Sequence, residues 1–426
     1  MALTKNQSNY AHFGLMPRWI VLAVKTCLQY NYFRINYKYN DQGVVVSKTR
    51  IGIIGSGFIA TGLRNLIQAS PDFVTSKILT RRPVNSIDGC PKGLVTNSLN
   101  ELIDHSDIVF ECSGDVIHAT DSILAATIAK KKVVTMNAEF HVTTGSYFAR
   151  RGDYVTDADG DQPGCLARLK QEVIGMGFEP MAYLNIKGFL NLNPERKEME
   201  YWSNLQKLSL DQTVSFTDGT KLQIEQTLVA NGLGATIAPN GMIGARLETL
   251  NDSDYLVEIA QQLGQPVSDY IMCKGAPPGV LIIAKSKLAD NLGDYIAVKP
   301  LRTKNGLGYV LLRPYHLTHL ESLNTVRKVL KGEEMLINNS TNPAFTVAAV
   351  AKRKINKHEV IEKGAGGFDV RGIALSMQDN KDAVPVCLLQ NTKVIRDIEP
   401  GQIVCFDDVE MAESNALNFY SQILNS

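Results

Sequence analysis

The middle of the chain contains lysines and an acid whose types and spacing suit proton movement at an oxygen atom. Lys221 and Glu225 lie four residues apart in a predicted helix over residues 220–231, and Lys187 follows an apolar run at 181–186. Hydride transfer at a carbonyl or carbinol needs a group that moves the hydroxyl proton and a positive group that polarises the oxygen. A buried lysine can do either, because burial lowers its pKa. We predict that Lys187 and Lys221 are catalytic and that Glu225 orients the substrate; the alternative is an exposed ion pair worth about 0.3–0.5 kcal/mol.

Three acids alternate with small residues at Asp157, Asp159 and Asp161, directly after a predicted strand. The spacing imitates the start of a calcium-binding loop, but Gln162 and Arg168 stand where that loop requires glycine and glutamate. We expect Asp159 to orient the substrate through its hydroxyls. A divalent ion is a less favoured alternative, and a loop or helix cap is another.

His316, His319 and Glu321 have the chemistry for part of a metal site. Two histidines three residues apart on a helix are more often ordinary, and no further ligand pattern stands nearby, so we predict no metal site. The alternative is that His316, beside Tyr315, lines the substrate cleft.

A glycine-rich turn lies between a predicted strand and a predicted helix near residue 55. Gly55 and Gly57 fit the G-x-G-x-x-A pattern that ends at Ala60. In such turns the first glycine permits the bend, the second lets the backbone approach a pyrophosphate, and the helix amides face the phosphates. We predict that Gly55, Gly57, Phe58 and Ile59 bind a dinucleotide; the alternative is a glycine turn that binds none.

The ends of two further strands refine the cofactor prediction. The strand over 73–79 ends in Arg81 and Arg82, without the acid that holds a ribose hydroxyl in NAD-binding proteins, so NADP(H) is favoured over NAD(H). Solvated loop charges are the alternative. Ser113 and Gly114 follow the strand over 107–111 and are expected at the same edge of the sheet.

Seven motifs in order resemble the homoserine dehydrogenase-like oxidoreductases that end in a SAF domain, a group that includes a deoxyxylulose-phosphate reductoisomerase-like branch. The resemblance begins near residue 50 and rests on 133–139, 157–164, 185–188, 216–221, 313–317, 352–354 and 364–368. It implies a nicotinamide cofactor, contacted also by Asn137, and a homodimer. It further implies a C-terminal domain that can lie over the active site, where basic residues such as Lys352 would meet an anionic substrate; the alternative is that this domain only packs against the rest of the protein and its basic residues are solvated.

One departure bears on the substrate. Homoserine dehydrogenases commonly have a lysine directly after the asparagine, whereas this chain has Ala138 and Glu139 after Asn137, as in the reductoisomerase-like branch. We therefore expect an NADP-preferring oxidoreductase that acts on a small polyhydroxylated carbonyl or alcohol, with or without a phosphate. The alternatives are a reductoisomerase that uses a divalent metal and a non-catalytic nucleotide-binding sensor.

The predicted elements give an α/β fold. Alternating strands and helices predict a doubly wound parallel Rossmann sheet over 48–155. Mixed elements, including a strand at 279–284, predict an α+β catalytic and dimerisation domain over 156–345. Short strands such as 347–351 and 384–389 predict a small β-rich, SAF-like domain over 346–426. Residues 1–47 show no period and are interpreted as an add-on of uncertain structure.

Composition excludes several classes of partner. The 426 residues carry 44 Lys and Arg against 43 Asp and Glu, a net charge of +1, which is too small a surplus for a nucleic-acid protein. The 7 cysteines lack any C-x-x-C pair, which favours a reducing, cytoplasmic location without disulfides or structural zinc. The apolar stretch at 19–24 is far too short to span a membrane. We expect a small-molecule substrate, with no nucleic acid or membrane partner.

Overall fold

The structure, a computed structural model, describes residues 37–40, 43–46, 48–87, 89–91 and 93–425. The chain divides into two compact units, 1–47 and 48–426. In the first unit, β1 (Tyr37–Asn40) and β2 (Gly43–Val46) form an antiparallel hairpin. The rest of the predicted add-on lies outside the described residues. Of the helices that the structure describes, none combines the length and hydrophobicity needed to cross a membrane.

A six-stranded, wholly parallel sheet opens the second unit and confirms the predicted Rossmann fold. Its strands are β3 (Thr49–Ile54), β4 (Phe73–Leu79), β5 (Val95–Thr96), β6 (Ile108–Glu111), β7 (Val133–Thr135) and β8 (Val155–Asp157). Their order in the sheet is β5-β4-β3-β6-β7-β8. The direction of winding reverses between β3 and β6, and ligands of such sheets bind at that point, outside the carboxyl ends of the strands.

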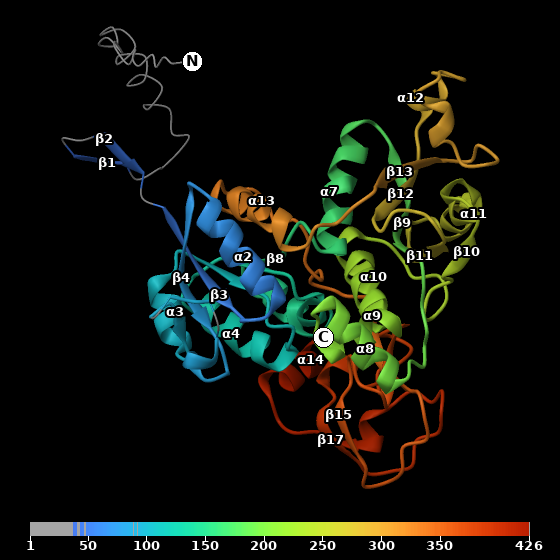
Figure 1. Cartoon of the computed structure of the whole chain (residues 1–426). Helices are drawn as coiled ribbons and strands as arrows, with labels where there is room; N and C mark the ends of the chain where they lie inside the picture. The colour runs from blue at the N-terminus through green and yellow to red at the C-terminus, as the bar shows by residue number, and fades with distance from the viewer. Residues whose placement is uncertain (1–36, 41–42, 47, 88, 92, 426) are drawn as a thin grey trace, which may run out of the picture. The chain divides into compact units, whose positions relative to one another are not determined.

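Helices cover both faces of this sheet because successive strand residues point to opposite sides. Ile53 packs with α2 (Phe58–Ala69) and α13 (His319–Leu330) on one face, whereas Ile54 packs with α3 (Leu99–His105) and α4 (Val116–Ile128) on the other. Figure 1 shows α13 beside α2. A helix from late in the chain therefore completes the helical layer on this face of the parallel sheet, although sequence order alone predicts it in the central domain.

A five-stranded mixed sheet forms the middle of the unit. Its strands are β9 (Glu179–Lys187), β10 (Ala245–Leu247), β11 (Val267–Cys273), β12 (Val280–Lys285) and β13 (Tyr309–Arg313), in the order β10-β11-β9-β12-β13. The helices α7 (Gln162–Gly175) and α10 (Thr220–Leu233) pack on one face, and α11 (Asp254–Leu263) packs on the other. Shorter connecting elements are α5 (Ala138–Phe140), a π-helical turn η2 (His141–Gly145), α6 (Ser146–Arg150), α8 (Arg196–Gln206), α9 (Leu210–Thr217) and α12 (Lys287–Asp290).

The C-terminal residues form a β-rich module and a closing helix. Strand β14 (Phe345–Ala351) pairs with β16 (Val370–Ser376), and β15 (Val360–Lys363), β17 (Gln390–Val394) and β18 (Val409–Glu410) form a second sheet. The helix α14 (Asn415–Leu424) returns to pack on α4. The predicted strand at 384–389 is wrong: it forms a 3-10 turn at Val386–Leu388, because Pro385 has no N–H to continue a ladder.

Buried polar contacts tie the C-terminal module to the start of α10. The Lys352 ammonium lies 2.5 Å from the carboxylate of Asp218, and the two side chains are only 4% and 0% exposed. The backbone N–H of Gly372 donates to the hydroxyl of Thr220, and that of Ala374 donates to the amide oxygen of Gln223, both at 2.9 Å. Lys352 is therefore held inside the protein and does not attract the substrate, contrary to the expectation from sequence.

We predict that Lys352→Met lowers the free energy of unfolding by about 3–5 kcal/mol, because it leaves a carboxylate buried without its partner. The additional change Asp218→Asn removes that charge and is expected to restore part of the loss. Urea unfolding measures both effects. The control is Lys354→Met, which breaks an exposed pair with Glu399 and should lower stability by no more than about 1 kcal/mol. Equal losses in the two lysine variants would contradict the role of the buried pair.

Candidate active site

The glycine turn after β3 has the shape that a dinucleotide requires. Gly55 has a φ of +116°, and a Cβ atom there would lie 2.9 Å from the carbonyl oxygen of Cys112, so the position admits only glycine. A Cβ atom on Gly57 would have no described atom within 4 Å. The helix α2 starts directly after Gly57, and no described side chain caps it. Its first amides are therefore free to bind phosphate oxygens.

The predicted arginines lie beside this turn. Arg82 donates to the backbone oxygen of Ser56 at 2.6 Å and to its hydroxyl at 2.9 Å. The hydroxyls of Ser56 and Thr80 are 2.8 Å apart, and Arg81 forms an ion pair of 2.6 Å with Asp115. The structure thus gathers two guanidinium groups and two hydroxyls at the carboxyl ends of β3 and β4. Ser56 and Thr80 were not predicted from the sequence, although both stand within the motifs used there.

A buried carboxylate shapes the loop after β6. Glu111 accepts hydrogen bonds from the backbone N–H of Ser113 at 2.7 Å, from its hydroxyl at 2.6 Å and from the Thr135 hydroxyl at 2.8 Å. Burial raises the pKa of Glu111 above its ordinary value. These bonds hold Ser113 and Gly114 at the edge of the cleft described next. Asn137 is fully buried and caps α5 by accepting a hydrogen bond from the Phe140 backbone N–H, and its predicted contact with the cofactor stays a prediction.

A cleft of about 320 Å³ opens at this edge of the sheet, and three parts of the chain line it. The loops and helices that follow β3, β6 and β7 contribute Gly57, Phe58, Ile59, Cys112, Ser113, Gly114, Val116, Met136 and Glu139. The central domain contributes Ser209, Asp211, Gln212, Ser215, Phe216 and Lys221. The C-terminal module contributes Lys363, Ala365, Cys387, Leu389 and Gln390.

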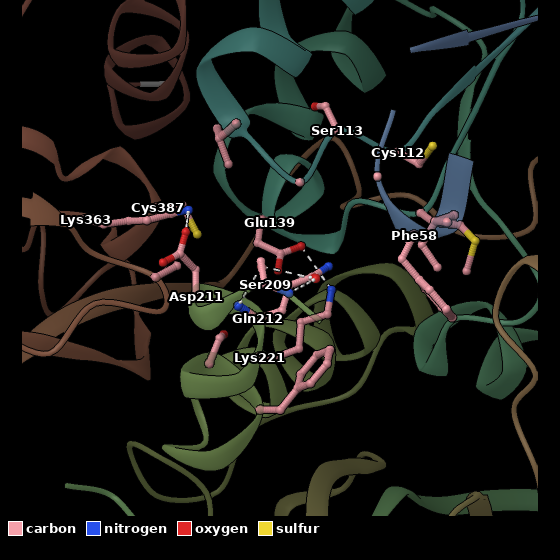
Figure 2. A pocket seen from close by; sticks show the side chains of 18 of the residues that line it. Phe58, Cys112, Ser113, Glu139, Ser209, Asp211, Gln212, Lys221, Lys363 and Cys387 are labelled. Carbon is pink, nitrogen blue, oxygen red and sulfur yellow. Dashed lines mark hydrogen bonds and ion pairs between the residues drawn. The ribbon is translucent and has the colours of Figure 1, made fainter. Parts of the chain in front are cut away.

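Lys221 is the centre of a cluster of carboxylates at this cleft. Its Nζ atom donates to Glu139 at 3.0 Å and lies 3.9 Å from Asp161 and 4.0 Å from Glu225. Figure 2 shows Lys221 and Glu139 pointing toward each other. Burial disfavours the ammonium form, but the three carboxylates outweigh it and raise the pKa of Lys221 well above its usual value. The expectation of a lowered lysine pKa is therefore wrong here, and the side chain is a fixed cation.

A second layer of polar groups holds this cluster. Asn185 donates to Glu225 at 2.9 Å. With its amide nitrogen turned inward, Gln162 donates to Asp161 and Glu225, both at 3.0 Å, and accepts from His316 at 3.3 Å. Burial raises the pKa of Glu225 to about 7. This carboxyl group can therefore gain and lose a proton near neutral pH.

Lys187 and Asp157 complete the surroundings of the cluster. Lys187 ends β9, and its positive charge opposes the rise in the pKa of Glu225. Asp157 is fully buried, and neither carboxylate oxygen has a hydrogen-bond partner among the described residues. Burial, together with the charge of Asp161, raises the pKa of Asp157 well above its usual value. The structure thus brings Lys187, Lys221 and Glu225 into one neighbourhood, and their catalytic roles stay predictions.

Asp159 does not join them. Its carboxylate binds Arg313 at 2.9 Å and Arg168 at 3.4 Å, in a separate network that also contains Glu321. The backbone reverses at Gly160, which has a φ of +107°, so the acids on its two sides, Asp159 and Asp161, face different sites. The acid that reaches Lys221 is Asp161.

Sequence reasoning also missed Glu139, Gln162 and Asn185. A signal existed for Asn185, because it lies two residues before Lys187 in one strand and side chains two apart share a face. Glu139 and Gln162 lie within the motifs at 133–139 and 157–164, but nothing in the neighbouring sequence indicates where their side chains point.

The candidate metal ligands form an ion-pair network. Among the described residues, ligand atoms of Asp159, Cys165 and Glu321 lie within 4.8 Å of one another. The guanidinium of Arg313 already bridges the two carboxylates, and burial raises the pKa of the Cys165 thiol. His319 packs against the Phe58 ring, with centroids 5.6 Å apart, whereas His316 contacts Gln162. The two histidines therefore have different surroundings.

Comparison with known proteins supports the oxidoreductase class predicted from the sequence. Residues 160–322 match the family model of the oxidoreductase DRL catalytic domain, a segment that begins before α7 and ends within α13. No curated protein matches the chain.

Solved structures give distant similarities. A homoserine dehydrogenase from Thiobacillus denitrificans is 13% identical over 79% of this chain and 94% of its own, with a TM-score of 0.42. A probable dehydrogenase from Thermotoga maritima is 13% identical over 68% of this chain and 91% of its own, with a TM-score of 0.38. A UDP-N-acetylglucosamine 3-dehydrogenase from Acidithiobacillus ferrooxidans is 11% identical over 69% of this chain and 92% of its own, with a TM-score of 0.40.

The pKa of Glu225 predicts a pH-dependent stability. Between the ordinary value of 4.5 and about 7, this carboxyl binds more protons in the folded than in the unfolded chain, so its ionisation destabilises the fold as pH rises. Glu225→Gln removes that loss. From pH 4.5 to pH 7 the variant should therefore gain about 3 kcal/mol of unfolding free energy relative to the parent protein.

Chemical unfolding at several pH values measures this difference, with the exposed change Glu198→Gln as the matched control. A stability difference between parent and Glu225→Gln that stays constant with pH would show that this carboxyl does not titrate as described.

Proposed function

We propose that this protein is an NADP-preferring oxidoreductase that transfers a hydride between the nicotinamide and a carbon of a small polyhydroxylated carbonyl compound or alcohol. The observation that carries the proposal is the position of Lys221. Its ammonium group lies in the same cleft as Gly57 and Ser113, where the cofactor-binding edge of the parallel sheet ends. A fixed cation at that place polarises a substrate oxygen.

The residues at the sheet edge fit a nicotinamide dinucleotide. The open space at Gly57 and the uncapped start of α2 suit its pyrophosphate. Arg81 and Arg82, with the hydroxyls of Ser56 and Thr80, would hold a ribose 2′-phosphate. When bound, the reduced cofactor supplies the hydride. The protein's own residues bind the substrate and move the proton of its hydroxyl group.

The residues around Lys221 polarise the substrate oxygen and transfer its proton in the proposed reaction. The Nζ atom of Lys221 donates a hydrogen bond to the carbonyl oxygen and stabilises the negative charge that develops there. The same atom then gives a proton to the alkoxide. Glu225, 4.0 Å away, returns a proton to Nζ and is left as a carboxylate, which takes up a proton again from solvent. Lys187 is the second lysine proposed to polarise the oxygen or move its proton.

A reductoisomerase that uses a divalent ion is the second candidate. The carboxylates Glu139, Asp157, Asp161 and Glu225 outnumber the two lysines, and such a set attracts cations. However, the ammonium group of Lys221 already lies within 4.0 Å of three of these carboxylates, those of Glu139, Asp161 and Glu225. Their ligand atoms also do not converge as those of Asp159, Cys165 and Glu321 do, within the described chain. A rate that needs Mg²⁺ or Mn²⁺ and stops with a chelator would favour this candidate.

If Lys221 is catalytic, its removal should slow turnover and leave cofactor binding unchanged. Lys221→Ala should lower kcat/KM by about 10²–10³, because a charge-stabilising group is removed from the transition state. The dissociation constant of NADPH should stay within about twofold of the parent value. Loss of NADPH absorbance with a panel of sugars and hydroxy-aldehydes measures the first, and cofactor fluorescence measures the second.

The control is Lys207→Ala, at the end of α8 and outside the cleft. NADPH binding with no turnover of any carbonyl by the parent protein would favour the non-catalytic sensor instead.

The arginines predict cofactor selectivity. Removing both side chains in Arg81→Ala/Arg82→Ala should weaken NADPH binding at least about tenfold, because each charged hydrogen bond contributes about 1.5–3 kcal/mol. NADH binding should change little, since NADH lacks the 2′-phosphate. Fluorescence titration with both cofactors tests this. Arg50→Ala, at the amino end of β3, is the matched control. Equal weakening for NADPH and NADH would contradict the assignment.

A further inference from the structure

One face of α9 forms the wall of the cleft opposite the cofactor sheet. Ser209, which precedes the helix, and Gln212, Ser215 and Phe216 within it all line the cleft. Residues three or four apart lie on the same face of a helix, so the lining follows from the helical repeat. Apart from the apolar ring of Phe216, these side chains are neutral hydrogen-bonding groups, whereas Asp211, which also lines the cleft from α9, is charged.

The Ser215 hydroxyl is unsatisfied. Ser215 is 7% exposed, and its Oγ atom has no hydrogen-bond partner in the described part of the chain. Its neighbours behave differently: the hydroxyls of Thr213 and Thr217 donate to the carbonyl oxygens of Ser209 and Thr213, at 3.0 and 2.8 Å. A buried polar group without a partner costs about 1–3 kcal/mol, so a ligand that supplies the missing hydrogen bond gains that energy.

The charges that line the cleft cancel. Lys221 and Lys363 are the cations among the described residues that line it. Lys221 is paired with Glu139, and Lys363 is paired with Asp211 on α9. Both pairs are visible in Figure 2. A phosphate or carboxylate group is recognised by cations that are free to bind it. Because each of these two lysines is paired with a carboxylate, the described lining of the cleft has no surplus positive charge.

The C-terminal module fixes the position of this wall. The ion pair of Lys363 joins β15 to α9. A Cβ atom on Gly366 would lie 2.3 Å from the backbone oxygen of Asp211, so the two chain segments are in direct contact. Gln390, at the start of β17, adds another neutral amide to the cleft. The spacing between the α9 face and the cofactor sheet therefore depends on the module.

We propose that the part of the substrate remote from the reacting carbon is an uncharged polyol chain, whose hydroxyl groups are recognised by Ser215 and Gln212 of α9. This inference rests on the proposed function, because it takes the reacting carbon to lie at Lys221. Ser215 supplies one donor and two acceptor sites. The amide oxygen of Gln212 already accepts from the Ser209 backbone N–H at 3.3 Å and from the Ser209 hydroxyl at 3.2 Å, so Gln212 offers its amide NH2 group as a donor. Together the two side chains suit a hydroxyl that both donates and accepts. A site of this kind rejects analogues that lack the hydroxyl, since its own polar groups then stay unpaired.

Calorimetric titration of the full chain loaded with NADP⁺ tests the proposal directly. The probes are a panel of pentitols and hexitols, the terminal phosphate ester of each, and the terminally deoxygenated analogue of each. We expect a free polyol to bind at least about tenfold more tightly than its phosphate ester and its deoxygenated analogue, the latter from one lost hydrogen bond to a buried partner.

The variant Ser215→Ala separates recognition from folding. It should weaken binding of the free polyol about tenfold and leave the deoxygenated analogue unchanged, with kcat retained and KM raised. Ser421→Ala, on α14 and outside the cleft, is the matched control. An equal effect of Ser215→Ala on both probes, tighter binding of the phosphate ester, or no binding by any polyol would overturn the inference.

The two proposals fail differently. Turnover of carbonyl compounds together with preferred binding of phosphate esters would leave the oxidoreductase standing and reject the uncharged polyol. Binding of polyols without any NADPH oxidation would keep the recognition site and reject the catalytic role of Lys221.

Discussion

A single buried ammonium group, that of Lys221, sets the requirements that the surrounding structure meets. A charge removed from water is stable only if opposite charges and hydrogen bonds replace the solvent. Three carboxylates do so here, and they come from three places: Glu139 from the segment after β7, Asp161 from the start of α7, and Glu225 from the next turn of α10. The Rossmann sheet and the central domain must therefore be correctly docked before this cation is compensated. If that docking is lost, the carboxylates no longer compensate the ammonium group together, and their like charges repel one another.

The C-terminal module takes part in the same arrangement from the other side. Its buried Lys352 compensates Asp218 at the start of α10, one turn before Lys221, and its Lys363 holds α9 through Asp211. The helix α14 then returns to α4 and α6, and its Phe419 ring stacks on Tyr147 of α6 with centroids 3.7 Å apart. Because it contacts both the central domain and the helices beside the parallel sheet, the module constrains the width of the cleft between them.

The sequence predicted the fold well where local pattern and tertiary structure agree. The glycine turn, the parallel strands and the Lys221–Glu225 spacing all follow from local periodicity and were found where expected. Contacts that depend on long-range packing were not predictable. The turn at Gly160 sends Asp159 to Arg313 and Asp161 to Lys221, and α13 returns across the chain to cover α2. The protonation state of Lys221 could not be predicted from the sequence either. Burial lowers the pKa of a lysine and nearby carboxylates raise it, so only the geometry of the site decides which effect is larger.

The charge balance of the cleft also constrains the proposed chemistry. A near-neutral chain that binds an anionic substrate would need local cations, yet both lysines that line the cleft are compensated. The carboxylates that compensate Lys221 also keep it protonated, so in the resting protein it can donate a proton but cannot accept one. In the proposed mechanism, carbonyl reduction starts directly from this state. Alcohol oxidation first requires Lys221 to lose its proton to a neighbouring carboxylate, and Glu225, whose pKa is about 7, is the group able to take it at neutral pH. In the proposed mechanism the cluster can therefore run in either direction because one of its acids, Glu225, titrates near neutral pH.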